Sequence, residues 1–160
     1  MSCVLFAAAE DQTEACGRSL AASLPQQQSR ALKVFLWGEL GAGKTTWVRG
    51  FLRELGVTGR VRSPSFSLVE HYELPLHHVI HVDLYRLSGA ADVRALGLVD
   101  HDVAGAVWLI EWPERAANAL GSADLTVRLT AEGQGRRIEV ESMSPEGADW
   151  LAGSARSLSQ

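Results

Sequence analysis

The sequence predicts a single three-layer α/β domain, residues 1–160, built on a mixed, mainly parallel sheet. Continuous apolar runs typical of buried strands alternate with segments of helical periodicity, as expected of parallel strands joined by helices. A glycine-rich loop at residues 38–46 joins one such strand to a helix. Two further pairs of strand-like segments are separated by short turns and predict hairpins, so the sheet should also contain antiparallel strands. With 46% hydrophobic residues, a chain of this length can bury one good core.

The predicted elements of the first third of the chain flank the glycine-rich loop. Residues 4–8 are expected to form a short first strand, and residues 13–24 an amphipathic helix. A polar stretch then leads into residues 31–37, an apolar run expected to be a buried strand. Residues 45–55 follow the loop with helical periodicity, and Gly56 is a suitable residue just beyond the end of that helix.

The rest of the chain continues the alternation of strands and helices. Pro75 marks a turn between two strand-like segments, which predicts a hairpin, and Pro113 is well placed to open a helix because proline suits the first helical position. The expected elements are strands at residues 63–73, 79–84 and 106–110, helices at 90–98 and 113–120, a hairpin formed by 125–129 and 137–141, and a terminal helix at 145–158.

The loop at residues 38–46 has every fixed residue of the phosphate-binding motif G-x-x-x-x-G-K-[ST]. It reads Gly38-Glu39-Leu40-Gly41-Ala42-Gly43-Lys44-Thr45-Thr46. In this motif the glycines let backbone N–H groups surround the phosphates, the lysine brings its charge to the β- and γ-phosphate oxygens, and the threonine hydroxyl ligates Mg²⁺. The following helix presents its N-terminus to the same phosphates. We therefore predict a P-loop NTPase fold that binds a nucleoside triphosphate with Mg²⁺.

Two acidic residues close apolar runs and are candidates for catalytic carboxylates. Asp83 follows the strand-like residues 79–82, and Glu111 follows residues 106–110. A nucleotide hydrolase needs a carboxylate near its metal ion, usually at the C-terminal end of a strand next to the loop strand. An acid at a strand end is common by itself, but two of them beside a complete phosphate loop favour a hydrolytic site in which Lys44 is the third catalytic residue.

Several other side chains have two open interpretations or receive no role. Residues 63–67, Ser-Pro-Ser-Phe-Ser, are either a switch that senses the γ-phosphate through Mg²⁺ or a turn entering a strand. Trp112 is either a core-edge aromatic or a group that flanks the site. His81 is interpreted as a hydrogen-bonded core histidine rather than a base. The cysteines and the remaining histidines lack ligand-type spacing and receive no role: Cys3, Cys16, His71, His77, His78 and His101.

Charge and composition narrow the class of ligand. A net charge of −4 argues against strong sequence-independent binding of nucleic acid, although Arg49, Arg53, Arg60 and Arg62 form either a solvated basic face or a phosphate contact. Guanine-specific P-loop proteins use an Asn/Thr-Lys-x-Asp element, yet the only asparagine is Asn118 and no lysine follows position 44, so ATP is favoured over GTP.

The sequence has neither an apolar run of about 20 residues nor a secretory signal, so we expect a cytoplasmic protein without a membrane span.

Four motifs in order resemble the TsaE (YjeE) family. They are the phosphate loop at 38–46 and the segments Ser63-Pro64-Ser65-Phe66-Ser67-Leu68-Val69-Glu70, His81-Val82-Asp83-Leu84-Tyr85-Arg86-Leu87 and Ile110-Glu111-Trp112-Pro113-Glu114. The resemblance runs from about Thr13 to Glu141. It implies a bacterial ATPase that works with the TsaD and TsaB proteins. Together they install the threonylcarbamoyl group on the adenosine beside the anticodon of tRNAs that read codons beginning with A, and this chain need not grip the tRNA itself.

The resemblance also implies roles for residues of this chain. ATP and Mg²⁺ are the implied cofactors, with Thr45 and Glu111 holding the ion. Asp83 is implied as a residue needed for hydrolysis, either because it positions water or because it orders the metal shell. Contacts to the nucleotide are implied for the loop and for three residues outside it: Thr13, Gly38, Glu39, Leu40, Gly41, Ala42, Gly43, Lys44, Thr45, Thr46, Trp112 and Arg136.

Two other functions stay open on the residues alone. A small-molecule or nucleoside kinase would share the loop and the strand-end acids, but the sequence has no long arginine-rich insertion to serve as its lid. A nucleotide-responsive binding module, in which hydrolysis is incidental, would share all of these features.

Overall fold

The structure is a computed structural model that describes residues 1–116 and 118–157. One seven-stranded sheet runs through the molecule in the order β1-β7-β6-β2-β5-β4-β3. The strands are β1 (Ser2–Ala7), β2 (Leu32–Trp37), β3 (Val69–Glu73), β4 (His78–Asp83), β5 (Ala106–Glu111), β6 (Leu125–Glu132) and β7 (Gly135–Ser142). The helices are α1 (Glu10–Ala22), α2 (Lys44–Glu54), α3 (Ala90–Ala95) and α4 (Pro145–Ser157), with 3₁₀ helices η1 (Leu98–His101) and η2 (Pro113–Ala116).

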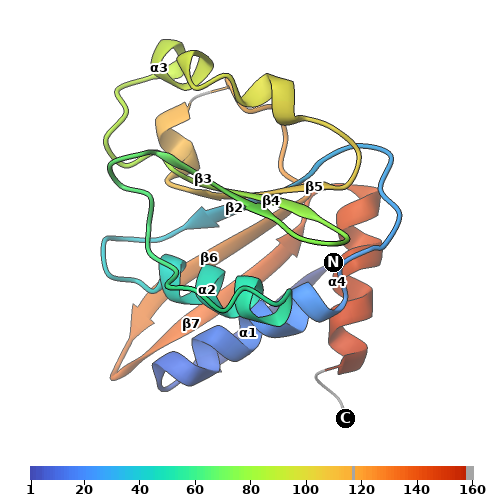
Figure 1. Ribbon diagram of the computed structural model, residues 1–160. Helices are drawn as coiled ribbons and strands as arrows, with labels where there is room; N and C mark the ends of the chain where they lie inside the picture. The colour runs from blue at the N-terminus through green and yellow to red at the C-terminus, as the bar shows by residue number, and fades with distance from the viewer. Residues whose placement is uncertain (117, 158–160) are drawn as a thin grey trace.

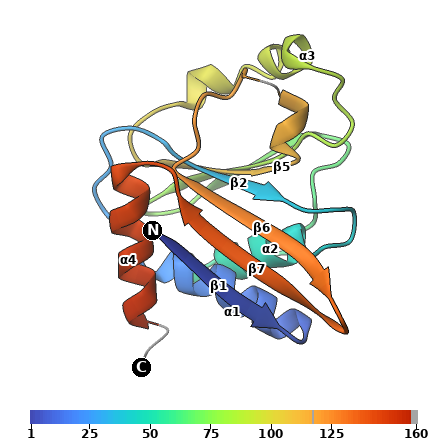
Figure 2. The ribbon, with the colours of Figure 1, turned by 180° about the vertical axis from the view of Figure 1, so that it is seen from behind.

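The centre of the sheet is parallel and its edges are antiparallel. Strands β6, β2, β5 and β4 pair in parallel. The hairpin β3–β4 closes one edge, and the hairpin β6–β7 together with β1 closes the other (Figure 2). The predicted mixed sheet with a parallel centre is therefore confirmed.

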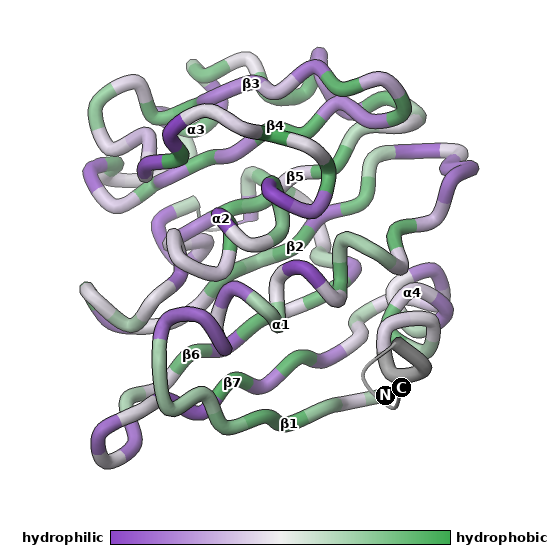
Figure 3. Tube along the Cα trace, turned by 60° about the horizontal axis from the view of Figure 1, so that its bottom comes forward, coloured by the Kyte–Doolittle hydropathy of each residue, from purple (hydrophilic) through white to green (hydrophobic). Residues whose placement is uncertain are grey.

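Helices cover both faces of the sheet. Figure 1 shows α1 and α2 on one face and α3 with the 3₁₀ helices on the other. Two core clusters result, one around Trp47 and Phe51 of α2 and the other around Ile80 and Trp108. Because β5 lies between the two layers, all six of its residues are buried, and Figure 3 colours it mainly as hydrophobic. No helix among the described residues is long and apolar enough to cross a membrane.

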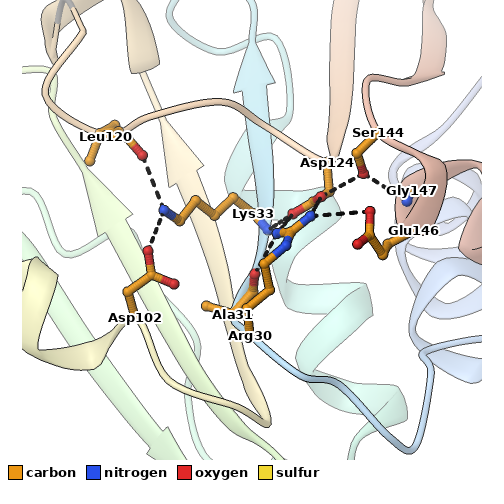
Figure 4. Close-up of polar contacts among 9 residues, drawn as sticks. All are labelled: Arg30, Ala31, Lys33, Asp102, Leu120, Asp124, Ser144, Glu146 and Gly147. Atoms are coloured by element: carbon orange, nitrogen blue, oxygen red, sulfur yellow. Dashed lines mark hydrogen bonds and ion pairs between the residues drawn. The ribbon is translucent and has the colours of Figure 1, made fainter.

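A buried carboxylate joins the start of α4 to the sheet (Figure 4). Asp124, only 1% exposed, accepts two hydrogen bonds from the Arg30 guanidinium at 2.7 and 3.0 Å and one from the Lys33 backbone N–H at 2.9 Å. The Ser144 hydroxyl donates to the same carboxylate at 2.6 Å. Burial alone would raise the pKa of Asp124, but the hydrogen bonds and the Arg30 charge outweigh it and hold the pKa below its usual value.

The segment at residues 63–68 is a loop, so the prediction of a strand from residue 63 was wrong in its first half. The Leu68 backbone N–H donates to the carbonyl of Pro64 at 2.6 Å, and Leu68 has a φ of 67°, so the chain turns here. Only Val69–Glu73 pairs with β4. Alternation of side chains predicted the strand, but alternation cannot tell how much of a segment has a partner strand.

The predicted helix at residues 113–120 was also wrong in extent, because only the 3₁₀ turn η2 forms. The Arg115 N–H donates to the Trp112 carbonyl and the Ala119 N–H to the Ala116 carbonyl, both with the i to i−3 spacing of 3₁₀ structure. Residue 117 lies outside the described residues, as does residue 158, the last residue of the predicted terminal helix. The predicted helix at 90–98 is shorter as well, since α3 ends at Ala95 and the chain turns at Gly97 before η1.

Candidate functional site

The candidate site lies where strands β2, β4 and β5 reach their C-terminal ends. The phosphate loop leaves β2 and leads into α2. Asp83 and Glu111 are register partners at the ends of β4 and β5, and Leu36 of β2 pairs with Glu111 on its other side. A cavity of about 430 Å³ opens here, a size suited to a nucleotide. The predicted site residues that line it are Leu40, Gly41, Gly43, Lys44, Thr45, Thr46, Asp83, Glu111, Trp112 and Arg136.

Glycine is required at position 43, where the loop meets α2. Gly43 has a φ of 103° and stands at the N-cap of α2, a left-handed conformation that side chains disfavour. A Cβ atom placed on Gly43 would collide with the guanidinium of Arg136. Arg136, at the start of β7, therefore lies directly against the loop and adds a positive charge to the cavity. Together with the N-terminus of α2, it makes this end of the cavity suitable for phosphate.

The Lys44 side chain folds back against the backbone of the phosphate loop. Its ammonium donates to the carbonyl oxygens of Gly38 and Glu39 and lies 4.0 Å from the centre of the Trp112 ring. Burial lowers the pKa of Lys44, while the nearby carboxylates, Glu111 and Asp83 first, oppose that shift. The sequence left two interpretations of Trp112, a core-edge aromatic or a group that flanks the site. In the structure Trp112 lines the cavity directly after Glu111, and its backbone has an unusual φ of 60°.

Glu111 is held between a hydroxyl and an imidazole. The Thr45 hydroxyl donates to its two carboxylate oxygens at 2.9 and 3.2 Å, and His81 Nε2 lies 2.8 Å from Oε1. Carboxylate and hydroxyl oxygens are ligands that Mg²⁺ accepts, and adjacent ligands of an octahedral Mg²⁺ lie about 2.9 Å apart. Thr45 and Glu111 therefore fit the predicted metal pair.

Asp83 is set beside this pair with partners of its own. The Ser63 hydroxyl donates to Oδ2, and the Tyr85 backbone N–H donates to Oδ1 at 2.9 Å. The carboxylate is almost fully buried, and it lines the same cavity as Ser63 and Ser65. The segment at residues 63–67 is thus a turn that leads into β3, and its Ser63 and Ser65 line the candidate site; a switch role for it stays a prediction.

Not every predicted residue reaches the cavity wall. Thr13 is fully buried, and its hydroxyl lies 3.5 Å from the Ala9 carbonyl within α1. Glu10, one turn earlier, lines the cavity instead. Gly38, Glu39 and Ala42 face a second hollow of about 460 Å³ on the outer side of the loop, between the loop and β6.

Three site residues were not identified from the sequence. Glu10 and Tyr85 reach the cavity through tertiary packing, which no local pattern signals. His81 had a usable signal, because residues two apart on a strand share a face, and His81 precedes Asp83 by two. Its Nδ1 has no hydrogen-bond partner among the described residues, so only one of its two ring nitrogens is hydrogen-bonded.

Comparison with known proteins gives concordant matches. Residues 7–138 match the family model described as Threonylcarbamoyl adenosine biosynthesis protein TsaE. A tRNA threonylcarbamoyladenosine biosynthesis protein TsaE from Haemophilus influenzae is 39% identical over 111 residues, which cover 69% of this chain and 70% of that protein. The TsaE protein of Rickettsia bellii is 31% identical over 130 residues, 81% of this chain and 87% of that protein.

Two matches come from Bacillus subtilis. Its protein of the same description is 35% identical over 105 residues, 64% of this chain and 63% of that protein. The crystal structure of its protein YdiB has a TM-score of 0.79 with this structure at 23% identity, and the match covers 98% of this chain and 96% of that one. At this identity the likeness shows a shared fold.

Proposed function

The chain belongs to the TsaE family, and from this premise we propose that it is an ATPase that serves a tRNA-modification complex. The proposed reaction is ATP and water to ADP and phosphate. The complex is that of the TsaD and TsaB proteins, and its product is threonylcarbamoylated adenosine beside the anticodon of tRNAs that read codons beginning with A. In this proposal the chain reaches tRNA only through its partners.

One observation supports this function above all: a phosphate loop and two strand-end carboxylates meet in one cavity. The Lys44 ammonium and the start of α2 line this cavity, and in the phosphate-loop motif these groups contact the phosphates. Thr45 and Glu111 would hold Mg²⁺, which when bound neutralises charge on the phosphates. The Trp112 ring and the Arg136 guanidinium flank the same space.

The two carboxylates receive different roles because their partners differ. Glu111 shares hydrogen bonds with the Thr45 hydroxyl and is assigned to the metal ion. Asp83 has no hydrogen bond to Thr45 among the described residues and instead contacts the turn at Ser63. We assign Asp83 to orienting the water whose oxygen attacks the γ-phosphorus as the bond to the β-phosphate oxygen breaks.

Replacement of Asp83 tests the proposal. In a reconstituted system with TsaD, TsaB, tRNA and all substrates, Asp83→Asn should retain ATP binding and partner association but sustain only about one round of modification. The matched control is Asp149→Asn, an exposed acid on α4, which should behave as wild type. Full multiple-turnover modification by Asp83→Asn, with wild-type ATP binding, would refute a hydrolytic role for this residue.

A further inference from the structure

Three histidines from separate parts of the chain meet away from the nucleotide cavity. His71 lies on β3, His78 begins β4, and His101 ends η1. One ring nitrogen of each lies within 4.8 Å of the others. Within residues 1–116 and 118–157, they are the one set of three or more His, Cys, Asp or Glu side chains close enough to share a metal ion. The sequence spacing of these histidines did not signal this proximity, because the three come from separate elements.

The spacing of the ring nitrogens suits a metal ion. His71 Nδ1 lies 3.0 Å from His78 Nε2, and the His101 ring centre is 4.7 Å from that of His71 and 5.9 Å from that of His78. Two nitrogen ligands on a tetrahedral Zn²⁺ lie about 3.3 Å apart, given Zn–N bonds of roughly 2.0–2.1 Å. Two nitrogens thus already have nearly this separation, and the third lies within 4.8 Å of both.

The backbone under each ring is fixed. His78 is the register partner of Glu73, and His71 precedes Glu73 by two, so His71 and His78 share one face of the hairpin as diagonal neighbours. The buried Trp108 donates its indole N–H to the His101 carbonyl at 3.2 Å. The His78 N–H donates to the Gly105 carbonyl in the loop that follows η1. These main-chain contacts hold the three elements together and limit the backbone reorganisation that binding would require.

The electrostatic setting also suits a bound cation. Burial, followed by the neighbouring His101 and His78, lowers the pKa of His71. Glu70 and Glu73 act on His71 in the opposite sense, which places negative charge beside the cluster.

We propose that His71, His78 and His101 form a Zn²⁺ site with a fourth position left for water. Three imidazoles are a ligand set that suits Zn²⁺, whereas Mg²⁺ prefers oxygen. The site is distinct from the nucleotide cavity, because His78 stands five residues before Asp83, about 16 Å along the strand, and faces the opposite side of the sheet. A bound ion would tie the edge hairpin to η1 and so stabilise the folded chain.

Metal titration of the full chain without a polyhistidine tag tests the proposal. Zn²⁺ is titrated against a chromophoric competitor with excess Mg²⁺ present, which occupies oxygen-rich sites. The expected result is one Zn²⁺ per chain, with affinity weakened at least about tenfold by His71→Asn and by His101→Asn. The matched control is His77→Asn, which removes the histidine next to His78 that is outside the cluster and should leave affinity unchanged.

Two further readouts separate a lost ligand from a lost fold. Co²⁺ in place of Zn²⁺ should give the visible absorption of a tetrahedral site in wild type and His77→Asn, and lose it in the cluster variants. Zn²⁺ should raise the Tm of wild type and His77→Asn but not of His101→Asn. The proposal is overturned if wild type binds no Zn²⁺ at millimolar concentration, or if the cluster variants and His77→Asn bind it equally.

Discussion

The Glu111 carboxylate depends on His81 as well as on Thr45. Both the acid and the imidazole are buried, and their 2.8 Å contact leaves Glu111 Oε1 shared between the ring and the Thr45 hydroxyl. In metal sites, a side chain that hydrogen-bonds to a ligand residue sets the orientation of that ligand and its affinity for the ion. We therefore regard His81 as a positioning residue of the site.

Removal of the His81 ring should weaken the response to Mg²⁺. We expect His81→Ala to raise the Mg²⁺ concentration that half-activates ATP hydrolysis by about 10–100-fold, while metal-free nucleotide binding changes little. His81→Gln retains a donor and should recover part of the loss. Titration of ATPase activity with Mg²⁺ is the measurement, and an unchanged half-activating concentration in His81→Ala would show that the ring does not position Glu111.

The site residues differ in how well the sequence could reveal them. Lys44 and Thr45 belong to a motif in which each residue type has a defined contact, and Asp83 and Glu111 follow because parallel strands end at one edge. Glu10 lines the cavity only because α1 packs against α2, a contact that a local sequence pattern does not reveal. Thr13, expected at the nucleotide from the family resemblance, is fully buried and does not line the cavity.

At the level of elements, the helix that begins at the phosphate loop is held by very close packing against α1. A Cβ atom on Gly50 of α2 would overlap the Glu14 carbonyl, and one on Gly17 of α1 would overlap the Trp47 carbonyl. The Arg49–Glu14 ion pair at 2.6 Å closes the same contact. Because α2 presents Lys44 and Thr45, the interface with α1 sets their position.

A methyl group at this interface should destabilise the fold. Alanine favours a helix over glycine by about 1 kcal/mol, yet we expect Gly50→Ala to lower the free energy of unfolding by about 1–3 kcal/mol, because the backbones must separate. Gly59→Ala is the matched control, since its Cβ would meet nothing within 4 Å. It should change the free energy of unfolding by no more than about 0.5 kcal/mol. Urea unfolding measures both, and a neutral or stabilising Gly50→Ala would contradict the tight contact.

The extent of elements was predicted less well than their existence. The apolar run of β5 identified a buried strand because both of its faces are covered, whereas every second residue of β2 is only half-buried. The helix expected from Pro113 was too long, because proline marks a helix start but does not determine where the helix stops. The loop at residues 63–68 lies beside the cavity, where its turn brings Ser63 to Asp83.

Across the whole molecule, the Asp124 carboxylate joins the region around the start of β2 to the start of α4, which is distant from it in the chain. Its partners come from the segment entering β2, from β2 itself and from the start of α4. Arg30 is 43% exposed in its side chain, so solvent screens part of its attraction to Asp124. The part-buried hydrogen bonds from the Lys33 backbone and the Ser144 hydroxyl add to this attraction.

The stability due to Asp124 should disappear in acid. Its folded pKa lies below the unfolded value of about 3.9, so its contribution is complete above that pH and is lost as the pH falls through the folded pKa. We expect Asp124→Asn to cost about 2–3 kcal/mol at pH 7 and progressively less below about pH 4. Urea unfolding of wild type and Asp124→Asn across pH tests this. A difference in free energy of unfolding that stays constant with pH would contradict it.

The charge of the whole chain bears on its handling of tRNA. The net charge is −4, and several arginines are already paired with carboxylates: Arg18, Arg30, Arg49 and Arg137. We expect the isolated chain to bind tRNA weakly at physiological salt, because its net charge is negative and four of its arginines already face carboxylates. Fluorescence anisotropy with labelled tRNA measures this, and sub-micromolar affinity would overturn the proposed division of labour with the partners.

The most direct test of the central claim follows the γ-phosphate of ATP in the reconstituted complex. With γ-labelled ATP, TsaD, TsaB, tRNA and all substrates present, the label should appear as inorganic phosphate while modification continues through many rounds. Asp83→Asn should abolish the phosphate release and limit modification to about one round. Transfer of the label to another acceptor, or repeated modification without phosphate release from ATP by this chain, would contradict the claim.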